Sequence, residues 1–238
     1  MQKRKPGHGI YGIGLIVCVI FAVILLLYLV VTVIHHVRGS QMQTAQSGEA
    51  VLEEKYIAEW PTLQVELLEP NEYSRPQIAL EKVNGIVIHY TANAGTTAQQ
   101  NRDYFNGLAE SHETYASSHF VIGLSGEIIQ CIPCSEIAYA SNERNSDTIA
   151  IECCIPDETG QFNGETYDAL VQLTAWLIGR YDLSISDVIR HYDITGKICP
   201  KYFVDHEDKW EQFKNDVVQY IMLHGTDKSE RDKTTENE

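Results

Sequence analysis

An uncharged apolar run near the amino terminus places the strongest constraint on how this chain folds. Residues Ile10 to Ile34 read IYGIGLIVCVIFAVILLLYLVVTVI and include no charged side chain. A helix rises about 1.5 Å per residue, so this run can cross a bilayer core of roughly 30 Å. A signal peptide has a shorter apolar region and a small-residue cleavage site, and the first such site here, near Thr44 and Ala45, lies well past the run. The run therefore predicts a transmembrane helix over residues 10–34, in preference to a signal peptide or a buried core helix.

The residues before the run predict the orientation of the chain. Segment 1–9 contains Lys3, Arg4 and Lys5 and no acidic residue. Basic flanks of a membrane span are retained in the cytoplasm. We therefore expect a single-pass protein of the cell membrane, with a cytoplasmic amino terminus and an extracytoplasmic main domain.

Three further segments follow the apolar run. Residues 35–60 include the polar stretch GSQMQTAQSGEAVLEE, which is rich in small residues and has no sustained apolar period, as is typical of a flexible stalk. Residues 61–223 alternate between strand-like and helix-like periods and predict one folded domain. Residues 224–238, HGTDKSERDKTTENE, lack large apolar side chains and predict a disordered polar tail.

The charge balance excludes one class of partner. The chain has 238 residues, with 18 Lys and Arg against 33 Asp and Glu, for a formal net charge of -15. Binding to a nucleic acid backbone requires an extended basic surface. We therefore expect no nucleic acid partner, and we expect the chain to be a monomer that contacts the cell membrane through its single span.

The periods within 61–223 predict an α/β domain with a mixed central sheet flanked by helices. Ser125 and Gly126 form a hairpin signal between two apolar runs, and Thr96 and Thr97 can cap a helix. The expected strands cover 83–90, 118–124, 127–133 and 148–155, and the expected helices cover 98–109, 166–181 and 205–223.

The chemistry of the domain concentrates in HYDITGKICP, residues 191–200. His191 and Cys199 are eight positions apart, and Gly196 between them allows the chain to turn back. His89 ends the buried strand IVIHY and is a third candidate ligand. Imidazole and thiolate are ligands that Zn²⁺ prefers, and three protein ligands leave one tetrahedral position open, as in catalytic sites.

Four segments, taken together, resemble the zinc-dependent N-acetylmuramoyl-L-alanine amidases of the phage-lysozyme and peptidoglycan-recognition type, known as the amidase 2 family. The resemblance covers about residues 74–220. It is carried by IVIHYTA (86–92), SSHFVIGLSGEIIQ (117–130), NSDTIAIE (145–152) and RHYDITGKICP (190–200), in the order found in the family.

The resemblance implies a role for each matching residue. His89, His191 and Cys199 match the three ligands of one Zn²⁺. Glu152 matches the glutamate that handles the proton of the reacting water, and Lys197 matches the lysine near the substrate carbonyl. Asn93, His119 and Asn145 are the expected substrate contacts, although Asn145 could equally shape the turn before its strand. The implied substrate is peptidoglycan, cleaved between the lactyl group of N-acetylmuramic acid and L-alanine. The alternative is a noncatalytic peptidoglycan-binding module of the same fold.

Two positions depart from the family pattern. Ser118 stands where some phage members carry a proton-handling tyrosine, so the chain would depend on Glu152 for that step. Ala140 stands where many members carry a histidine, and alanine cannot replace the hydrogen bonds of an imidazole.

The other cysteines of the domain leave two alternatives. Cys131 and Cys134 form one group and Cys153 and Cys154 another, in strands that are potential neighbours. The two groups could form a disulfide outside the cell, or all four could be buried free thiols.

Overall fold

The structure, a computed structural model, describes residues 9–229, apart from the side chains of 9–19 and 38–47. The chain divides into two compact units, residues 1–47 and 48–238. The basic flank before the apolar run and most of the expected tail lie outside the described residues.

The first unit contains most of helix α1, Gly9–Glu54, which has 46 residues. Its segment Ile20–Val37 has a mean hydropathy of 2.5, and the large apolar side chains there are exposed. Among the described residues, α1 is the one helix with the length and composition to cross a membrane.

The expected flexible stalk differs from the structure, because residues 39–54 continue α1 as a helix. This stretch contains no proline and is rich in Gln, Ala, Glu and Met, which favour helix. Leu52 is buried in the core of the second unit, and Val51 packs against that core. The last turns of α1, from Gly48, therefore belong to the folded domain.

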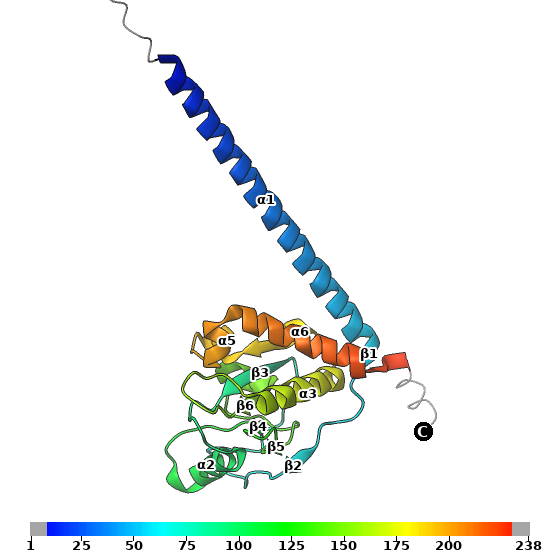
Figure 1. Ribbon diagram of the computed structural model, residues 1–238. Helices are drawn as coiled ribbons and strands as arrows, with labels where there is room; N and C mark the ends of the chain where they lie inside the picture. Colours follow the sequence, from blue (N-terminus) through cyan, green and yellow to red (C-terminus); the bar gives the residue numbers. More distant parts are fainter. Residues whose placement is uncertain (1–8, 230–238) are drawn as a thin grey trace, which may run out of the picture. The chain divides into compact units, whose positions relative to one another are not determined.

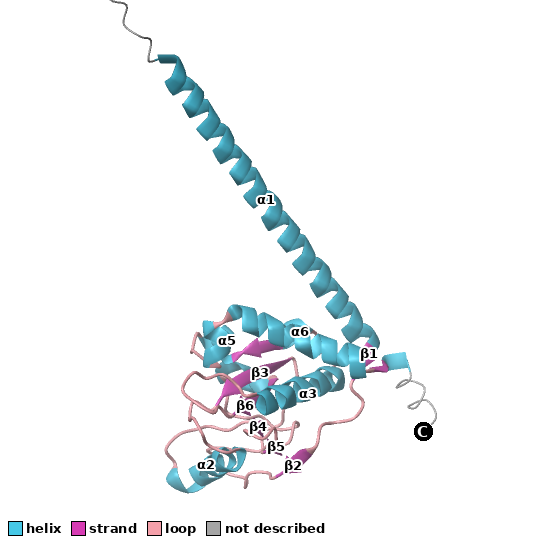
Figure 2. Ribbon diagram, viewed as in Figure 1, coloured by secondary structure: helices cyan, strands magenta, loops and turns pink. Residues whose placement is uncertain are grey.

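The second unit is built on a six-stranded mixed sheet, which confirms the predicted fold class (Figure 2). Strand β4 pairs with β5 antiparallel, and the other neighbouring pairs are parallel. In sheet order the strands are β2 (Leu63–Val65), β5 (Ile128–Gln130), β4 (Phe120–Ile122), β6 (Thr148–Cys153), β3 (Gly85–Tyr90) and β7 (Val188–Arg190).

Helices cover both faces of this sheet (Figure 1). On one face, α3 (Gly164–Tyr181) and α6 (Glu207–His224) form a core with the buried isoleucines of β3 and β6, namely Ile86, Ile88, Ile149 and Ile151. On the other face, α2 (Ala98–Ser111) packs on Val121 and Ile129. Because strand side chains alternate between faces, His89 and Glu152 point to the α2 face.

Local signals explain how several elements begin and end. Thr97 caps α2 and forms a capping box with Gln100. The expected hairpin exists, but its strands are shorter, and its turn closes through the Gly123 amide donating to the Glu127 carbonyl at 2.8 Å. Gly126 has a φ of 79°, which favours glycine.

The beginning of the expected disordered tail is ordered. Strand β8 (Thr226–Asp227) pairs antiparallel with β1 (Lys55–Tyr56). This pairing joins segments about 170 residues apart, so the local polar composition of either segment does not reveal it. The rest of the tail, from residue 230, lies outside the described residues.

The cysteine alternatives are resolved in favour of free thiols. Cys131, Cys153 and Cys154 are buried and Cys134 is partly buried, and none forms a disulfide. Burial raises the pKa of the Cys131 and Cys154 thiols to about 12, so both are protonated at neutral pH.

Candidate metal centre and catalytic cavity

The sheet topology brings the two histidines together. His89 lies near the carboxyl end of β3, and His191 begins the short helix α4 (His191–Thr195) directly after β7. Strands β3 and β7 are parallel neighbours, with Ile88 opposite Arg190. The two histidines therefore leave the sheet at the same edge, and their ring centroids lie 4.8 Å apart.

The loop after α4 returns Cys199 to these histidines. Gly196, with a φ of 77°, ends α4, and the Tyr192 amide donates to the Cys199 carbonyl at 2.9 Å. The Cys199 Sγ then lies 3.7 Å from His89 Nδ1. All three ligand atoms lie within 4.8 Å of one another, and all three residues are buried.

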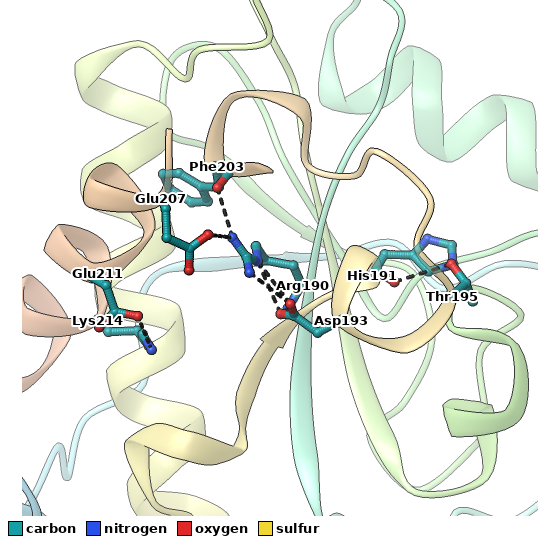
Figure 3. A network of polar contacts seen from close by, with 8 residues as sticks. All are labelled: Arg190, His191, Asp193, Thr195, Phe203, Glu207, Glu211 and Lys214. Carbon is teal, nitrogen blue, oxygen red and sulfur yellow. Dashed lines mark hydrogen bonds and ion pairs between the residues drawn. The ribbon is translucent and has the colours of Figure 1, made fainter. Parts of the chain in front are cut away.

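Arg190 fixes the chain on both sides of His191 (Figure 3). Its guanidinium pairs with Asp193 in α4 at 2.8 Å and with Glu207 in α6 at 2.6 Å. It also donates to the Phe203 carbonyl in α5 (Lys201–Asp205) at 2.9 Å. Figure 3 shows the His191 ring pointing away from this cluster. A single buried cation thus ties together the three helices around the loop that carries His191 and Cys199.

Each histidine ring is oriented by a hydrogen bond at Nε2, the ring nitrogen that is not one of the clustered ligand atoms. His191 Nε2 lies 3.0 Å from the Asn142 Oδ1, which can only accept, so Nε2 carries the proton. His89 Nε2 lies 3.2 Å from the Ser141 Oγ. The lone pair of His191 is then on Nδ1, which is buried and has no hydrogen-bond partner. Such an arrangement is typical of metal-ligating histidines.

The donor set fits a zinc ion. Two imidazole nitrogens and one thiolate are common zinc ligands. Zinc–nitrogen and zinc–sulfur bonds of about 2.0 and 2.3 Å at a tetrahedral angle place nitrogen and sulfur about 3.5 Å apart, close to the separation seen here between His89 and Cys199. The unpartnered Nδ1 of His191 is the kind of buried polar atom that a bound cation would satisfy.

Burial sets the protonation states of the three ligands. It lowers the pKa of His89 well below the usual range, and electrostatic repulsion from His191 and Lys197 lowers the pKa further. Burial also lowers the pKa of His191. Both imidazoles are therefore neutral at neutral pH, the form that binds metal. Burial raises the pKa of Cys199 to about 12, and a cation at this point would favour its thiolate.

Glu152 and Lys197 share a cavity of about 380 Å³ with His89 and His191. Glu152 pairs in register with His89 across β3 and β6, and its Oε2 is buried without a hydrogen-bond partner. Burial raises the pKa of Glu152 to about 8, against a smaller opposing effect of Lys197. Lys197 is exposed and reaches the cavity from the loop after α4.

The three expected substrate contacts occupy different positions. Asn145 lines the cavity, and its Oδ1 accepts from the Ala140 and Ser141 amides at 3.0 and 2.6 Å, so it also shapes the loop. Asn93 is exposed and does not line the cavity.

His119 needs correction as a substrate contact, because it is fully buried and outside this cavity. Its Nδ1 accepts from the Ala150 amide at 3.0 Å, and its Nε2 donates to the Glu136 carbonyl at 2.9 Å. Both ring nitrogens thus form hydrogen bonds to the backbone that stabilise the fold.

The burial of His119 predicts a pH dependence of stability. Its pKa is lowered to about 4, mainly by burial, from 6.5 in the unfolded chain. The unfolded state therefore binds more protons between these values, and stability falls as pH drops from 6.5 towards 4. The difference of about 2.5 units corresponds to roughly 3 kcal/mol. Urea unfolding at pH 7 and pH 4.5 should show a smaller loss in His119→Gln than in the parent; equal losses would contradict this role.

Ser141 and Asn142 are site residues that the sequence motifs missed. They directly follow Ala140, which stands where many family members carry a histidine, and the sequence pattern gives neither of them a role. Asn142 begins the short 3-10 helix Asn142–Ser146 with a φ of 54°, a conformation that asparagine tolerates. An Asn directly after Ser in the loop before the strand that carries Glu152 was the available signal, and it is a weak one.

Removing the Asn142 amide should weaken metal binding. Asn142→Gly keeps the backbone conformation and removes the acceptor that orients His191. We expect the affinity for zinc to fall by about 10–100-fold, as for other partners of metal ligands. Competition with a chromogenic chelator would measure this, with Asn93→Ala as the control. Unchanged affinity in Asn142→Gly would show that His191 needs no such partner.

The region that contains this site is similar to known proteins. Residues 79–202 match the amidase 2 family, described as N-acetylmuramoyl-L-alanine amidase. The N-acetylmuramoyl-L-alanine amidase CwlL of Bacillus licheniformis is 36% identical over 160 residues, covering 62% of this chain and 44% of the relative. The amidase BlyA of Bacillus subtilis (strain 168) is 31% identical over 186 residues, covering 69% and 49%. The chain thus spans less than half the length of these curated relatives.

Solved structures share the fold. PlyL superposes with a TM-score of 0.57 at 23% identity, covering 66% of this chain and 97% of PlyL. The catalytic domain of XlyA superposes with a TM-score of 0.55 at 24% identity, covering 66% and 99%. Since the family match extends over more than half of the sequence, this chain belongs to the amidase 2 family of N-acetylmuramoyl-L-alanine amidases.

Proposed function

We propose that the chain is a membrane-anchored, zinc-dependent amidase that hydrolyses peptidoglycan between the lactyl group of N-acetylmuramic acid and L-alanine of the stem peptide. The observation that carries this proposal is the convergence of three ligand atoms beside a buried carboxylate oxygen that has no partner. The named relatives support the choice of bond and substrate. A noncatalytic binding module would gain nothing from the unpaired Glu152.

The metal would be held by His89 and His191 through Nδ1 and by Cys199 through its thiolate. When bound, zinc polarises a carbonyl oxygen and makes a water nucleophilic near neutral pH. The orienting bonds from Ser141 and Asn142 keep both rings directed at this point. All three ligand residues are buried, which limits the access of bulk water to this point.

Glu152 and Lys197 supply the remaining chemistry. Glu152, as a carboxylate, takes a proton from the attacking water and returns it to the nitrogen of the leaving L-alanine. The nearby Lys197 ammonium lowers the pKa of Glu152, and a divalent cation held by the three ligands would lower it further and favour the carboxylate. Lys197 also stabilises the negative charge that develops on the carbonyl oxygen of the substrate. The products are a free lactyl carboxylate and a peptide with a new amino terminus.

Digestion of purified cell walls tests the hydrolase and its metal together. The full chain in detergent should clear a peptidoglycan suspension. The clearing should stop after treatment with a chelator and resume when zinc is added back. Clearing that persists after complete removal of metal would refute zinc dependence. Binding to the walls without clearing would support the noncatalytic module.

The apolar segment of α1 supports a membrane anchor with the domain outside the cell. We expect external protease to degrade the amidase domain in intact cells stripped of their wall, because the basic amino-terminal segment stays in the cytoplasm. An epitope at the amino terminus should remain protected until the membrane is permeabilised. The opposite pattern, a protected domain with a cleaved amino terminus, would reverse the orientation. Release of the full domain from membranes by salt alone would argue against an anchor.

A further inference from the structure

Four aromatic rings in successive contact lead to the catalytic cavity. Tyr73 stacks on His112 with ring centroids 4.3 Å apart and on Tyr115 at 5.0 Å. Tyr115 in turn meets Tyr139 edge to face at 5.6 Å. We call these four residues the aromatic ladder. Tyr115 and Tyr139, its inner members, line the cavity that also contains Glu152 and Lys197.

Tyr115 is held rigid although it contributes nothing to the core. Its side chain is 52% exposed, and its hydroxyl donates to the Glu72 Oε1 at 3.0 Å. The contacts with Tyr73, Tyr139 and Glu72 fix both the ring plane and the direction of the hydroxyl. A preorganised, exposed aromatic ring loses little entropy when a ligand packs on it.

The cavity lining contains two chemical kinds of side chain. Phe105, Tyr115 and Tyr139 are aromatic and neutral, whereas Glu152 and Lys197 are ionisable and flank the candidate ligands. The proposed substrate also has two parts, which meet at the scissile amide. On one side is an N-acetylated sugar, which is neutral and has apolar C–H faces; on the other is a stem peptide.

The electrostatics near the aromatic side chains favour the sugar over a peptide with carboxylates. The Glu72 carboxylate accepts a hydrogen bond from the Tyr115 hydroxyl at this end. A carboxylate there repels an anionic peptide and can accept hydrogen bonds from sugar hydroxyl and acetamido groups. The C–H face of a sugar ring packs on an aromatic ring through dispersion and its electrostatic complement.

We propose that Tyr115 and Tyr139 form a saccharide subsite, which binds an N-acetylated sugar of the glycan strand beside the metal centre. This inference rests on the proposed function and adds to it the part of the substrate that the aromatic ladder recognises. Tyr73 and His112 support the subsite from behind by stacking and do not themselves contact the sugar. The subsite positions the glycan so that the lactyl amide reaches Glu152.

Binding of two probes to the full chain in detergent tests the subsite. The first probe is an uncharged, peptide-free disaccharide of N-acetylglucosamine, and the second is a sugar-free stem peptide. Titration followed by NMR gives the Kd of each probe. Tyr115→Ala should raise the Kd of the disaccharide by roughly tenfold, the effect of losing one buried aromatic contact. It should leave the Kd of the stem peptide within about twofold.

Two further variants separate the ring from other effects. Tyr115→Phe keeps the stacking face and should bind the disaccharide within about threefold of the parent. Tyr104→Ala removes a tyrosine of similar exposure, 50%, that does not line the cavity, and it should bind as the parent does. Zinc content and thermal midpoint should be unchanged in Tyr115→Ala, which excludes misfolding as the cause.

The outcomes distinguish this inference from the proposed function. No binding of the disaccharide to the parent, or an equal loss of both probes in Tyr115→Ala, overturns the saccharide subsite. A loss confined to the stem peptide would assign the ladder to the peptide instead. If the disaccharide binds as expected but the parent releases no L-alanine amino termini from peptidoglycan, the proposed function fails while the subsite stands.

Discussion

Replacing His191 by alanine should leave a folded protein that no longer retains zinc and no longer hydrolyses peptidoglycan. The side chain supplies one of the three ligand atoms that lie within 4.8 Å of one another. Four-ligand zinc sites bind with about 10–16 kcal/mol, so one ligand contributes roughly 3 kcal/mol, or about 10²–10³-fold in affinity. Elemental analysis after gel filtration measures the retained metal, and wall clearing measures activity.

Two control variants make this prediction specific. Cys199→Asp offers a carboxylate oxygen, which reaches zinc at about 2.0–2.2 Å, and should retain metal. Cys131→Ala removes another buried thiol, which belongs to the core under α2 and is not one of the three clustered ligand residues, and should also retain metal. Full zinc occupancy in His191→Ala, with the fold intact, would contradict the ligand assignment.

Replacing Glu152 by glutamine should abolish most of the turnover while leaving the metal in place. Glutamine has nearly the same size and can still form hydrogen bonds, but it cannot accept the proton of the attacking water. Loss of a general base costs about 10²–10⁴-fold in rate, equivalent to roughly 3–5 kcal/mol of barrier. Binding of peptidoglycan should change much less, because this interaction develops in the transition state.

The matched control for Glu152 is Glu110→Gln, which makes the same change at an exposed position on α2. It should retain the parent rate. Zinc content must be measured for both variants, since an unchanged metal separates loss of the base from loss of the ligand set. If Glu152→Gln hydrolyses peptidoglycan at more than about a tenth of the parent rate, another group acts as the base.

The clustering of His89, His191 and Cys199 was predictable from the sequence because it follows from topology. A histidine that ends a buried strand and a histidine that follows another meet if the strands are parallel neighbours, as β3 and β7 are. The eight-residue loop to Cys199 needed only Gly196 to turn back. The pairing of His89 with Glu152 follows from the same register.

Burial and remote contacts could not be predicted in the same way. His119 shares the α2 face with Glu152, but it contacts Ala150, three residues before the end of β6, where the sheet interior encloses it. No local sequence pattern distinguishes a fully buried position on this face, such as His119, from one that lines the cavity, such as Glu152. The helical residues 39–54 and strand β8 likewise depend on contacts with segments remote in sequence, which a polar composition conceals.

The sequence motifs also did not predict which residues orient the two histidine rings. Ser141 and Asn142 act through hydrogen bonds to His89 and His191, and they lie about 50 residues from either partner. The loop that holds them is shaped by the Asn145 side chain. A role of this kind becomes visible only when the partners are placed in space.

Identification of the bond that is cut tests the central claim most directly. Purified peptidoglycan is incubated with the full chain in detergent, and newly formed amino termini and reducing sugar ends are labelled and quantified. We expect new L-alanine amino termini in equal number to free lactyl groups, no new reducing ends, and a release at least about 10²-fold slower in Glu152→Gln. New reducing ends, or amino termini other than L-alanine, would contradict it.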